Sequence, residues 1–192
     1  MKKYEEQIKL YEPKNDQEIS DKSLIEKCIL FYGDKILTRE VDVAHITASS
    51  IILNPDFTKV LMAYHNIYQS WAWTGGHADG EEDLFYVAKK EAMEETGIKN
   101  FVPLTDNIVS IEILPVYGHI KRGKYVSAHL HLNVTYVLIV EEDEEIHNKP
   151  DENNGVMWIR IDELEKYSSE EEMIPVYKKI IDEAKKIRKE KS

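Results

Sequence analysis

The strongest constraint on the fold of this chain is a pair of glycines, Gly75-Gly76, followed closely by a short acidic helix. The helix is predicted over residues 83–96, where Asp83 is a suitable N-cap and Gly97 a suitable stop at the C-terminal end. A short strand is expected to run into the glycines. The segment therefore predicts a strand, a glycine turn and a helix in immediate succession.

Three glutamates of this helix, Glu91, Glu94 and Glu95, share one face, because on a helix of 3.6 residues per turn they fall within an arc of about 100°. One to two turns earlier the same side is apolar, so the face is expected to point towards the protein. Partly buried like charges are costly unless they are neutralised, and a divalent cation with oxygen ligands would neutralise them. Magnesium suits such a set; the alternative is a solvated acidic face.

Together with its flanks, this helix resembles the Nudix box, a motif of glycine, glutamate and a late Arg-Glu-apolar-x-Glu-Glu-x-Gly run at fixed spacing. The matching residues are Gly76, Glu82, Glu91, Glu94, Glu95, Gly97 and Ile98, with Ala92 as the small apolar residue. Lys90 stands where the family has arginine. The resemblance implies that Glu82 organises the loop with Lys90, although lysine cannot make the two-pronged contact of arginine.

The whole sequence predicts a single domain of the α/β (α+β) class. The resemblance implies a Nudix fold, with a mixed β-sheet sandwiched between helices, over residues 41–192. Strands are expected at residues 45–53, 59–65, 71–74, 108–117, 129–140 and 156–161. A short helix capped by Asp162 and a terminal helix over residues 170–189 should complete the domain.

Residues 1–40 lie outside the resemblance and are predicted to be a polar, helical N-terminal extension. Ser20-Asp21 is a candidate cap for a helix that Gly33 would end. Three roles remain open for the extension: it could close over the site, pair two copies into a homodimer, or extend the core.

The resemblance also implies a reaction, the attack of water on a pyrophosphate bond with Mg²⁺ or Mn²⁺ as the cofactor. The substrate would be a small nucleotide-like diphosphate or a nucleoside triphosphate-like compound. Glu94 and Glu95 would be metal ligands, Glu91 a ligand or the general base, and the carbonyl of Gly75 a further ligand. Nudix enzymes often add a carboxylate from a distant loop, for which Glu152 is the first choice and the alternatives are Glu141, Glu142 and Asp143.

Two histidines and a tryptophan are further candidates for the site. His129 and His131 lie on one face of a strand, and with His45, His65 or His119 they could form a metal site. They are also candidates for contact with the substrate. Trp71 could stack on a base. Core packing or surface placement is the competing interpretation for all three.

Composition excludes several partners. A net charge of −11 argues against a nucleic acid polymer or an anionic membrane as partner, because both attract basic surfaces. No apolar run is long enough to span a bilayer. Cys28 is the only cysteine, so neither an intrachain disulfide nor a thiolate zinc site can form, and a cytoplasmic location is expected.

Two other functions compete with hydrolysis. A non-catalytic Nudix-fold module that binds nucleotides for regulation often loses glutamates of the box, whereas this sequence retains all four. An isoprenoid-diphosphate isomerase on the same fold needs a cysteine in the active site. Cys28 lies before the catalytic core and does not meet that need.

Overall fold

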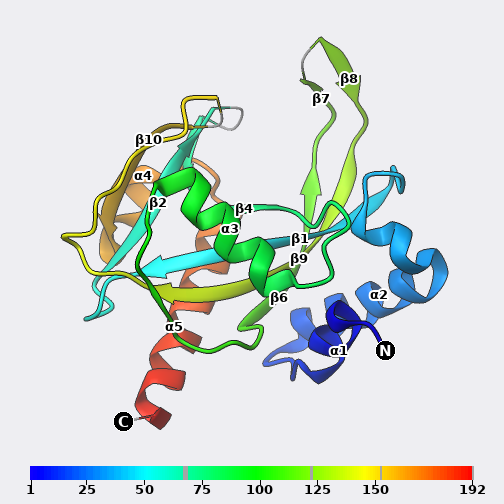
Figure 1. Cartoon of the computed structure of the whole chain (residues 1–192), viewed down its shortest axis with the longest axis horizontal. Coiled ribbons are helices and arrows are strands. Elements are labelled where there is room, and N and C mark those ends of the chain that lie inside the picture. Colours follow the sequence, from blue (N-terminus) through cyan, green and yellow to red (C-terminus); the bar gives the residue numbers. More distant parts are fainter. Residues whose placement is uncertain (67–68, 122, 152, 192) are drawn as a thin grey trace.

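A computed structural model describes residues 1–66, 69–121, 123–151 and 153–191. Two helices precede four strands, a single helix separates these from six further strands, and helices end the chain (Figure 1). In chain order the elements are α1 (Lys3–Leu10), α2 (Asp16–Tyr32), η1 (Gly33–Leu37), β1 (Ala44–Leu53), β2 (Lys59–His65), β3 (Ser70–Ala72), β4 (Thr74–His77), α3 (Leu84–Thr96), β5 (Val102–Pro103), β6 (Ser110–Val116), β7 (His119–Lys121), β8 (Lys124–Val126), β9 (His129–Ile139), β10 (Asn153–Arg160), η2 (Ile161–Glu163), α4 (Leu164–Tyr167) and α5 (Met173–Lys191).

The main sheet is built around β1, which is buried along its whole length. Along one edge β1 pairs in parallel with β9, from Ala44 opposite Leu130 to Leu53 opposite Ile139. Along the other edge it pairs antiparallel with β4 and then with β2. The remaining strands extend the sheet on both sides in the order β10-β2-β1-β9-β5, with β6 beside β9. The sheet is therefore mixed, as predicted.

Alternate residues of β1 face two different helical layers, because side chains on a strand point to opposite faces in turn. Ile46 and Ala48 pack with apolar residues of α3. Ile51 packs on the other face with Tyr177 and its neighbours on α5. Figure 1 shows α3 across the front of the sheet and α5 behind it. The predicted sandwich of a mixed sheet between helices is confirmed.

The N-terminal helices join the core on the α3 side. Tyr4 and Ile8 of α1 and Ile25 of α2 are fully buried, in one apolar cluster with Ile111 of β6 and Tyr136 of β9. The prediction that this segment is helical is confirmed. In the described part of the chain, no helix is long and apolar enough to cross a membrane.

Three predicted details of local structure are wrong. The helix α2 begins at Asp16 and not at Ser20-Asp21, because Asn15 caps it: Asn15 Oδ1 accepts a hydrogen bond from the Glu18 amide at 2.9 Å. The predicted end of this helix at Gly33, which has φ of 57°, is correct. Asp162 lies inside η2 and caps no helix. Gly75-Gly76 is not a turn but part of β4, paired with Ser49 and Ala48 of β1.

Candidate functional site

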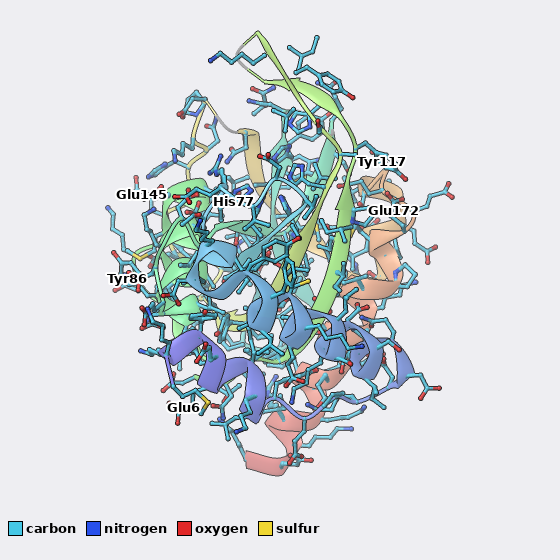
Figure 2. All side chains as sticks on the ribbon, turned by 90° about the vertical axis from the view of Figure 1, so that its right-hand side faces the viewer. Glu6, His77, Tyr86, Tyr117, Glu145 and Glu172 are labelled. Atoms are coloured by element: carbon cyan, nitrogen blue, oxygen red, sulfur yellow. The ribbon has the colours of Figure 1, made fainter. Side chains whose placement is uncertain are left out.

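A cleft of about 1400 Å³ opens on the α5 face of the sheet. Its floor is formed by β1, β4 and β9, and its walls by the hairpin β7–β8 and the beginning of α5. Tyr117 and Glu172, both labelled in Figure 2, belong to these walls, and His77 belongs to the floor. Gly75, Gly76 and Glu95 also line the cleft. The cleft therefore brings box residues together with side chains from distant parts of the sequence.

The acidic face of α3 lies directly against the two glycines of β4. Glu95 Oε1 accepts a hydrogen bond from the Gly75 amide at 3.1 Å. A Cβ atom on Gly76 would lie 2.5 Å from Glu91 Cδ, which is closer than real Cβ contacts allow. Glycine at this position therefore lets the Glu91 carboxylate approach the strand. The αL conformation of Gly97 ends α3 directly after these glutamates.

Two lysines balance the charge of these carboxylates. Lys149 Nζ lies 3.1 Å from Glu94 Oε2, and Lys90 Nζ lies 3.6 Å from Glu94 Oε1 and 3.5 Å from Glu91 Oε1. The hydrogen bond from Lys149, helped by the charge of Lys90, holds the pKa of Glu94 below its ordinary value. Glu94 is therefore ionised at neutral pH.

The predicted pairing of Glu82 with Lys90 differs from the one in the structure. Glu82 Oε1 binds Lys2 Nζ at 2.7 Å, and Lys2 also binds Asp34 at 2.8 Å. Lys90 instead contacts Glu91 and Glu94 on its own helix, the latter at i,i+4 spacing. The cation that binds the first box glutamate thus comes from the N-terminal segment, which local spacing in the box could not indicate.

The distal carboxylate predicted from the sequence, Glu152, lies outside the described residues. Residues on either side of it contact α3, since Lys149 binds Glu94 and Asn153 Nδ2 donates to the Glu95 carbonyl at 2.9 Å. The alternative Glu142 is held at the turn after β1, where Lys59 and Asn54 bind its carboxylate.

Four histidines gather on the floor of the cleft: His45 of β1, His77 of β4, and His129 and His131 of β9. One ring nitrogen of each lies within 4.8 Å of those of the other three. Strand register explains the cluster, because His45 is opposite His131, and His77 is opposite Thr47 on the same sheet face. Sequence analysis named His129, His131 and His45 but missed His77. The alternatives it named, His65 and His119, are not members.

The ring nitrogens of this histidine cluster are only partly satisfied. His45 Nδ1 lies 3.3 Å from the Val41 carbonyl and His129 Nδ1 lies 2.9 Å from the Ser127 carbonyl. Nε2 of His45 and Nε2 of His131 are buried and have no hydrogen-bond partner among the described residues. Burial, reinforced by the neighbouring His77 and His45, lowers the pKa of His131 to about 2. Burial also lowers the pKa of His45. These two rings are therefore neutral at physiological pH.

A chain of hydrogen bonds leads along the same sheet face away from the histidines. Thr47 and Ser49 both donate to Asn133 Oδ1 at 2.9 Å. Asn133 Nδ2 in turn donates to Thr135 Oγ1 at 3.0 Å, and Thr135 donates to Glu112 Oε2 at 3.2 Å. These buried polar residues were not identified from the sequence, since they alternate with apolar residues as in an ordinary strand.

The chain of hydrogen bonds ends in a buried charge cluster formed by Glu18, Glu112 and Lys179. Lys179 Nζ lies 3.0 Å from Glu18 Oε1 and 2.8 Å from Glu112 Oε1. Burial alone would raise the pKa of Glu18, but hydrogen bonds from Tyr11, the Lys14 amide and Lys179 hold it below its ordinary value. Burial raises the pKa of Glu112 despite Lys179. The cluster joins α2, β6 and α5.

Of Trp71 and Trp73, only Trp73 lines the cleft. Trp71 packs edge-on against Tyr64, with ring centroids 5.4 Å apart, and its role in stacking on a substrate stays a prediction. Trp73 is the tryptophan among the described residues that line the cleft, and it packs against Tyr177.

Comparison with known proteins identifies the domain. A model of the NUDIX domain matches residues 43–182. A search of curated protein sequences gives no match for this chain.

Solved structures of similar fold include three hydrolases. A C. elegans Ap4A hydrolase is 17% identical with a TM-score of 0.51, over 70% of this chain and 93% of that one. A NUDIX-family hydrolase from Clostridium perfringens is 19% identical with a TM-score of 0.50, over 72% of this chain and 96% of that one. The E. coli dihydroneopterin triphosphate pyrophosphohydrolase is 14% identical with a TM-score of 0.51, over 68% of this chain and 90% of that one. At these identities the likeness shows the shared fold.

Proposed function

This chain belongs to the Nudix family and is a Nudix-type pyrophosphohydrolase, and on that premise we propose that Glu91, Glu94 and Glu95 hold a divalent cation for the reaction. The bond that is cleaved would be a pyrophosphate bond in a small nucleotide-like compound. The observation that carries this proposal is the meeting of the acidic face of α3 with β4, where Glu95 binds the Gly75 amide and Glu91 lies against Gly76.

The donor set fits Mg²⁺ or Mn²⁺. Carboxylate oxygens, with the Gly75 carbonyl as a further candidate, are the hard ligands that these ions prefer. Glu91 and Glu95 are largely buried, with 16% of the Glu91 side chain and 8% of Glu95 exposed, while Glu94 faces solvent. Like charges so close together need a counter-charge. Lys90 and Lys149 supply part of it, and a bound cation would supply more.

When bound, the ion would polarise phosphate oxygens and lower the pKa of a water molecule. Glu94 and Glu95 are proposed as its ligands, and Glu91 as a ligand or as the base that accepts the proton of the attacking water. Glu152 is proposed as the distal carboxylate. Lys90 and Lys149, beside Glu94, could also neutralise charge on the phosphate that leaves.

The cleft suggests which substrates to try first. Aromatic side chains line it, including Trp73 and the exposed rings of Tyr125 on β8 and of Tyr117 just before β7. Such rings can stack on a base whatever its identity. Two proteins of similar fold carry the names of an Ap4A hydrolase and a dihydroneopterin triphosphate pyrophosphohydrolase. We propose that this chain takes a phosphate anhydride joined to an aromatic base, in a cytoplasmic setting.

The test is a panel of nucleoside triphosphates, dinucleoside polyphosphates and nucleotide sugars, assayed for released phosphate or monophosphate with and without Mg²⁺ or Mn²⁺. We expect turnover of at least one compound that stops on removal of the metal. Glu94→Gln and Glu95→Gln should each lower kcat by roughly 100-fold or more, because they remove ligand charge from the reacting centre.

Glu26→Gln on the exposed surface of α2 is the matched control and should leave kcat unchanged. Circular dichroism would establish that each variant is folded. Unaltered kcat in both site variants would refute the assignment of the metal ligands. Nucleotide binding without product from any compound would favour a non-catalytic binding module.

A further inference from the structure

The geometry of the cleft floor points to a second metal site. We propose that His45, His77, His129 and His131 bind a divalent transition-metal ion of the zinc type, separately from the carboxylates of α3. This proposal goes beyond hydrolysis and stands on the four imidazoles alone.

The positions of the four ligand atoms suit one ion. Each of them lies within 4.8 Å of the other three. Around a tetrahedral zinc with Zn–N bonds of about 2.0–2.1 Å, ligand nitrogens are roughly 3.3 Å apart. Small rotations about side-chain bonds would close that difference. The Cα positions need not move, because strand pairing already places His45 opposite His131 and sets His77 beside them.

The surroundings of the rings are those of metal-binding histidines. Such histidines usually donate their second ring nitrogen to a carbonyl or a carboxylate, which fixes the tautomer. Here the Nδ1 atoms of His45 and His129 lie at hydrogen-bonding distance from the backbone carbonyls of Val41 and Ser127. With its proton on Nδ1, each ring keeps the Nε2 lone pair available as a ligand.

Unsatisfied nitrogens supply an independent observation. Only 6% of the surface of His45 is exposed, and its Nε2 has no hydrogen-bond partner within residues 1–66, 69–121, 123–151 and 153–191. The same holds for Nε2 of His131. Buried polar atoms in folded proteins nearly always have partners, and each exception calls for an explanation such as an ion. A metal ion coordinated by both nitrogens would satisfy them.

The ligand type selects the metal. Four imidazole ligands suit Zn²⁺, Ni²⁺, Cu²⁺ or Co²⁺, whereas Mg²⁺ and Ca²⁺ require oxygen ligands. The nearby cation Arg39 is engaged by Asp79 through contacts of 2.9 and 3.0 Å, so its charge is compensated. The histidine cluster and the carboxylates of α3 thus offer different donors to different ions.

The experiment uses the full chain without an affinity tag, stripped with a chelator and held in excess Mg²⁺. Zn²⁺ is added in a calorimetric titration, and Co²⁺ in a parallel titration followed by visible absorption. We expect one tight Zn²⁺ equivalent per chain, and the intense d–d absorption of four-coordinate Co²⁺. Absence of saturable Zn²⁺ binding would overturn the proposal.

Variants locate the ion. His45→Ala and His131→Ala should each weaken Zn²⁺ binding by roughly 100-fold or more. His131→Gln should weaken it as much, and because glutamine is close to histidine in size this substitution should not disturb the fold. His147→Ala, an exposed histidine outside the cluster, is the matched control and should bind as the wild type does. Undiminished binding in His45→Ala and His131→Ala would refute the site.

A second pair of variants separates this proposal from the hydrolytic one. Glu94→Gln and Glu95→Gln should retain the tight Zn²⁺ site even though their kcat falls. Loss of Zn²⁺ binding in these variants would assign the ion to the carboxylates and overturn the histidine site. If the protein bound Zn²⁺ but hydrolysed none of the compounds, the histidine site would be supported and the proposed hydrolysis would be refuted.

Discussion

Two polar clusters lie on the same face of the central sheet, and they differ in how their atoms are satisfied. In the charge cluster, Lys179 binds both Glu18 and Glu112. Tyr11 and Ser110 complete it by donating to the carboxylates. In the histidine cluster, two buried nitrogens have no hydrogen-bond partner in the part of the chain that the structure describes. Both clusters are costly to bury, but in the charge cluster the chain itself supplies the partners.

Whether the members of a cluster satisfy one another distinguishes structural from functional polar groups. A buried network whose members satisfy one another makes the packing of its elements specific and needs nothing from outside. A cluster with aligned, unsatisfied nitrogens is complete only when a ligand is added. The first arrangement ties α2 and α5 to the sheet, and residues of both clusters line the cleft.

The largest effect on stability is expected from breaking the charge cluster. Lys179→Met would leave Glu18 and Glu112 buried together without a counter-charge, and removal of one partner from a buried ion pair costs about 3–5 kcal/mol. Chemical denaturation at pH 7 would measure the loss. Lys178→Met removes an exposed lysine from the same helix and should change the unfolding free energy little. Equal effects in the two variants would show that the cluster contributes nothing special.

At lower pH, most of the difference in unfolding free energy between Lys179→Met and the wild type should disappear. The contribution of Glu18, whose pKa is lowered, is complete above its ordinary value of 4.5 and is lost as the pH falls through the folded value. Glu112 has a raised pKa, so its contribution is complete below 4.5 and is lost as the pH rises through the folded value. Without Lys179 the folded pKa of both carboxyls would rise. The variant should therefore approach the wild type between pH 7 and about 4.5. A difference that stays constant over this range would contradict the expectation.

An intermediate effect is expected where the two clusters are linked. Asn133→Ala removes the acceptor of Thr47 and Ser49 and the donor to Thr135. Leaving buried hydroxyls unsatisfied should cost about 1–3 kcal/mol in the free energy of unfolding. The exposed Asn107→Ala is the control, with little change expected. If Asn133→Ala proved as stable as this control, the linking hydrogen bonds would have no energetic weight.

The smallest effect is expected in the histidine cluster without metal. His131→Leu replaces an imidazole whose Nε2 lacks a partner by an apolar side chain of similar size, so stability should change by no more than about 1 kcal/mol. With Zn²⁺ at 100 times its Kd, the wild type alone should gain about 2.7 kcal/mol. Thermal unfolding with and without Zn²⁺ would measure both. If metal-free His131→Leu lost as much unfolding free energy as Lys179→Met does, the histidine cluster would have a structural role.

Local signals made much of the fold predictable. The strand at residues 45–53, the second strand β2 and the helix α3 were all predicted within a residue or so, because turn residues and caps mark their ends. Gly97 ends α3 in the αL conformation, as its type suggests. Sequence analysis set no separate bounds for α1, and it missed the short strand β5 and the hairpin β7–β8, since their hydrophobic patterns are brief.

Contacts between distant residues account for what was missed at the site. Lys2 reaches Glu82, and no pattern within the box could indicate a cation so far away in the chain. His77 lies next to Gly76 in sequence, but only the pairing of β4 with β1 places it beside His45. The charge cluster likewise depends on α5 packing against β6. Such groupings depend on which strands pair, and local residue patterns do not show that pairing.

During synthesis, β1 emerges from the ribosome long before its parallel partner β9 does. Until residues 129–139 arrive, one edge of β1 offers unpaired amide and carbonyl groups along a strand that is buried in the folded protein. Such an edge can template association with another nascent chain. Because closing so long a loop is entropically slow, this step is expected to limit the folding rate and to set the demand for chaperones. Expression yield, and not only activity, should therefore respond to substitutions along this pairing.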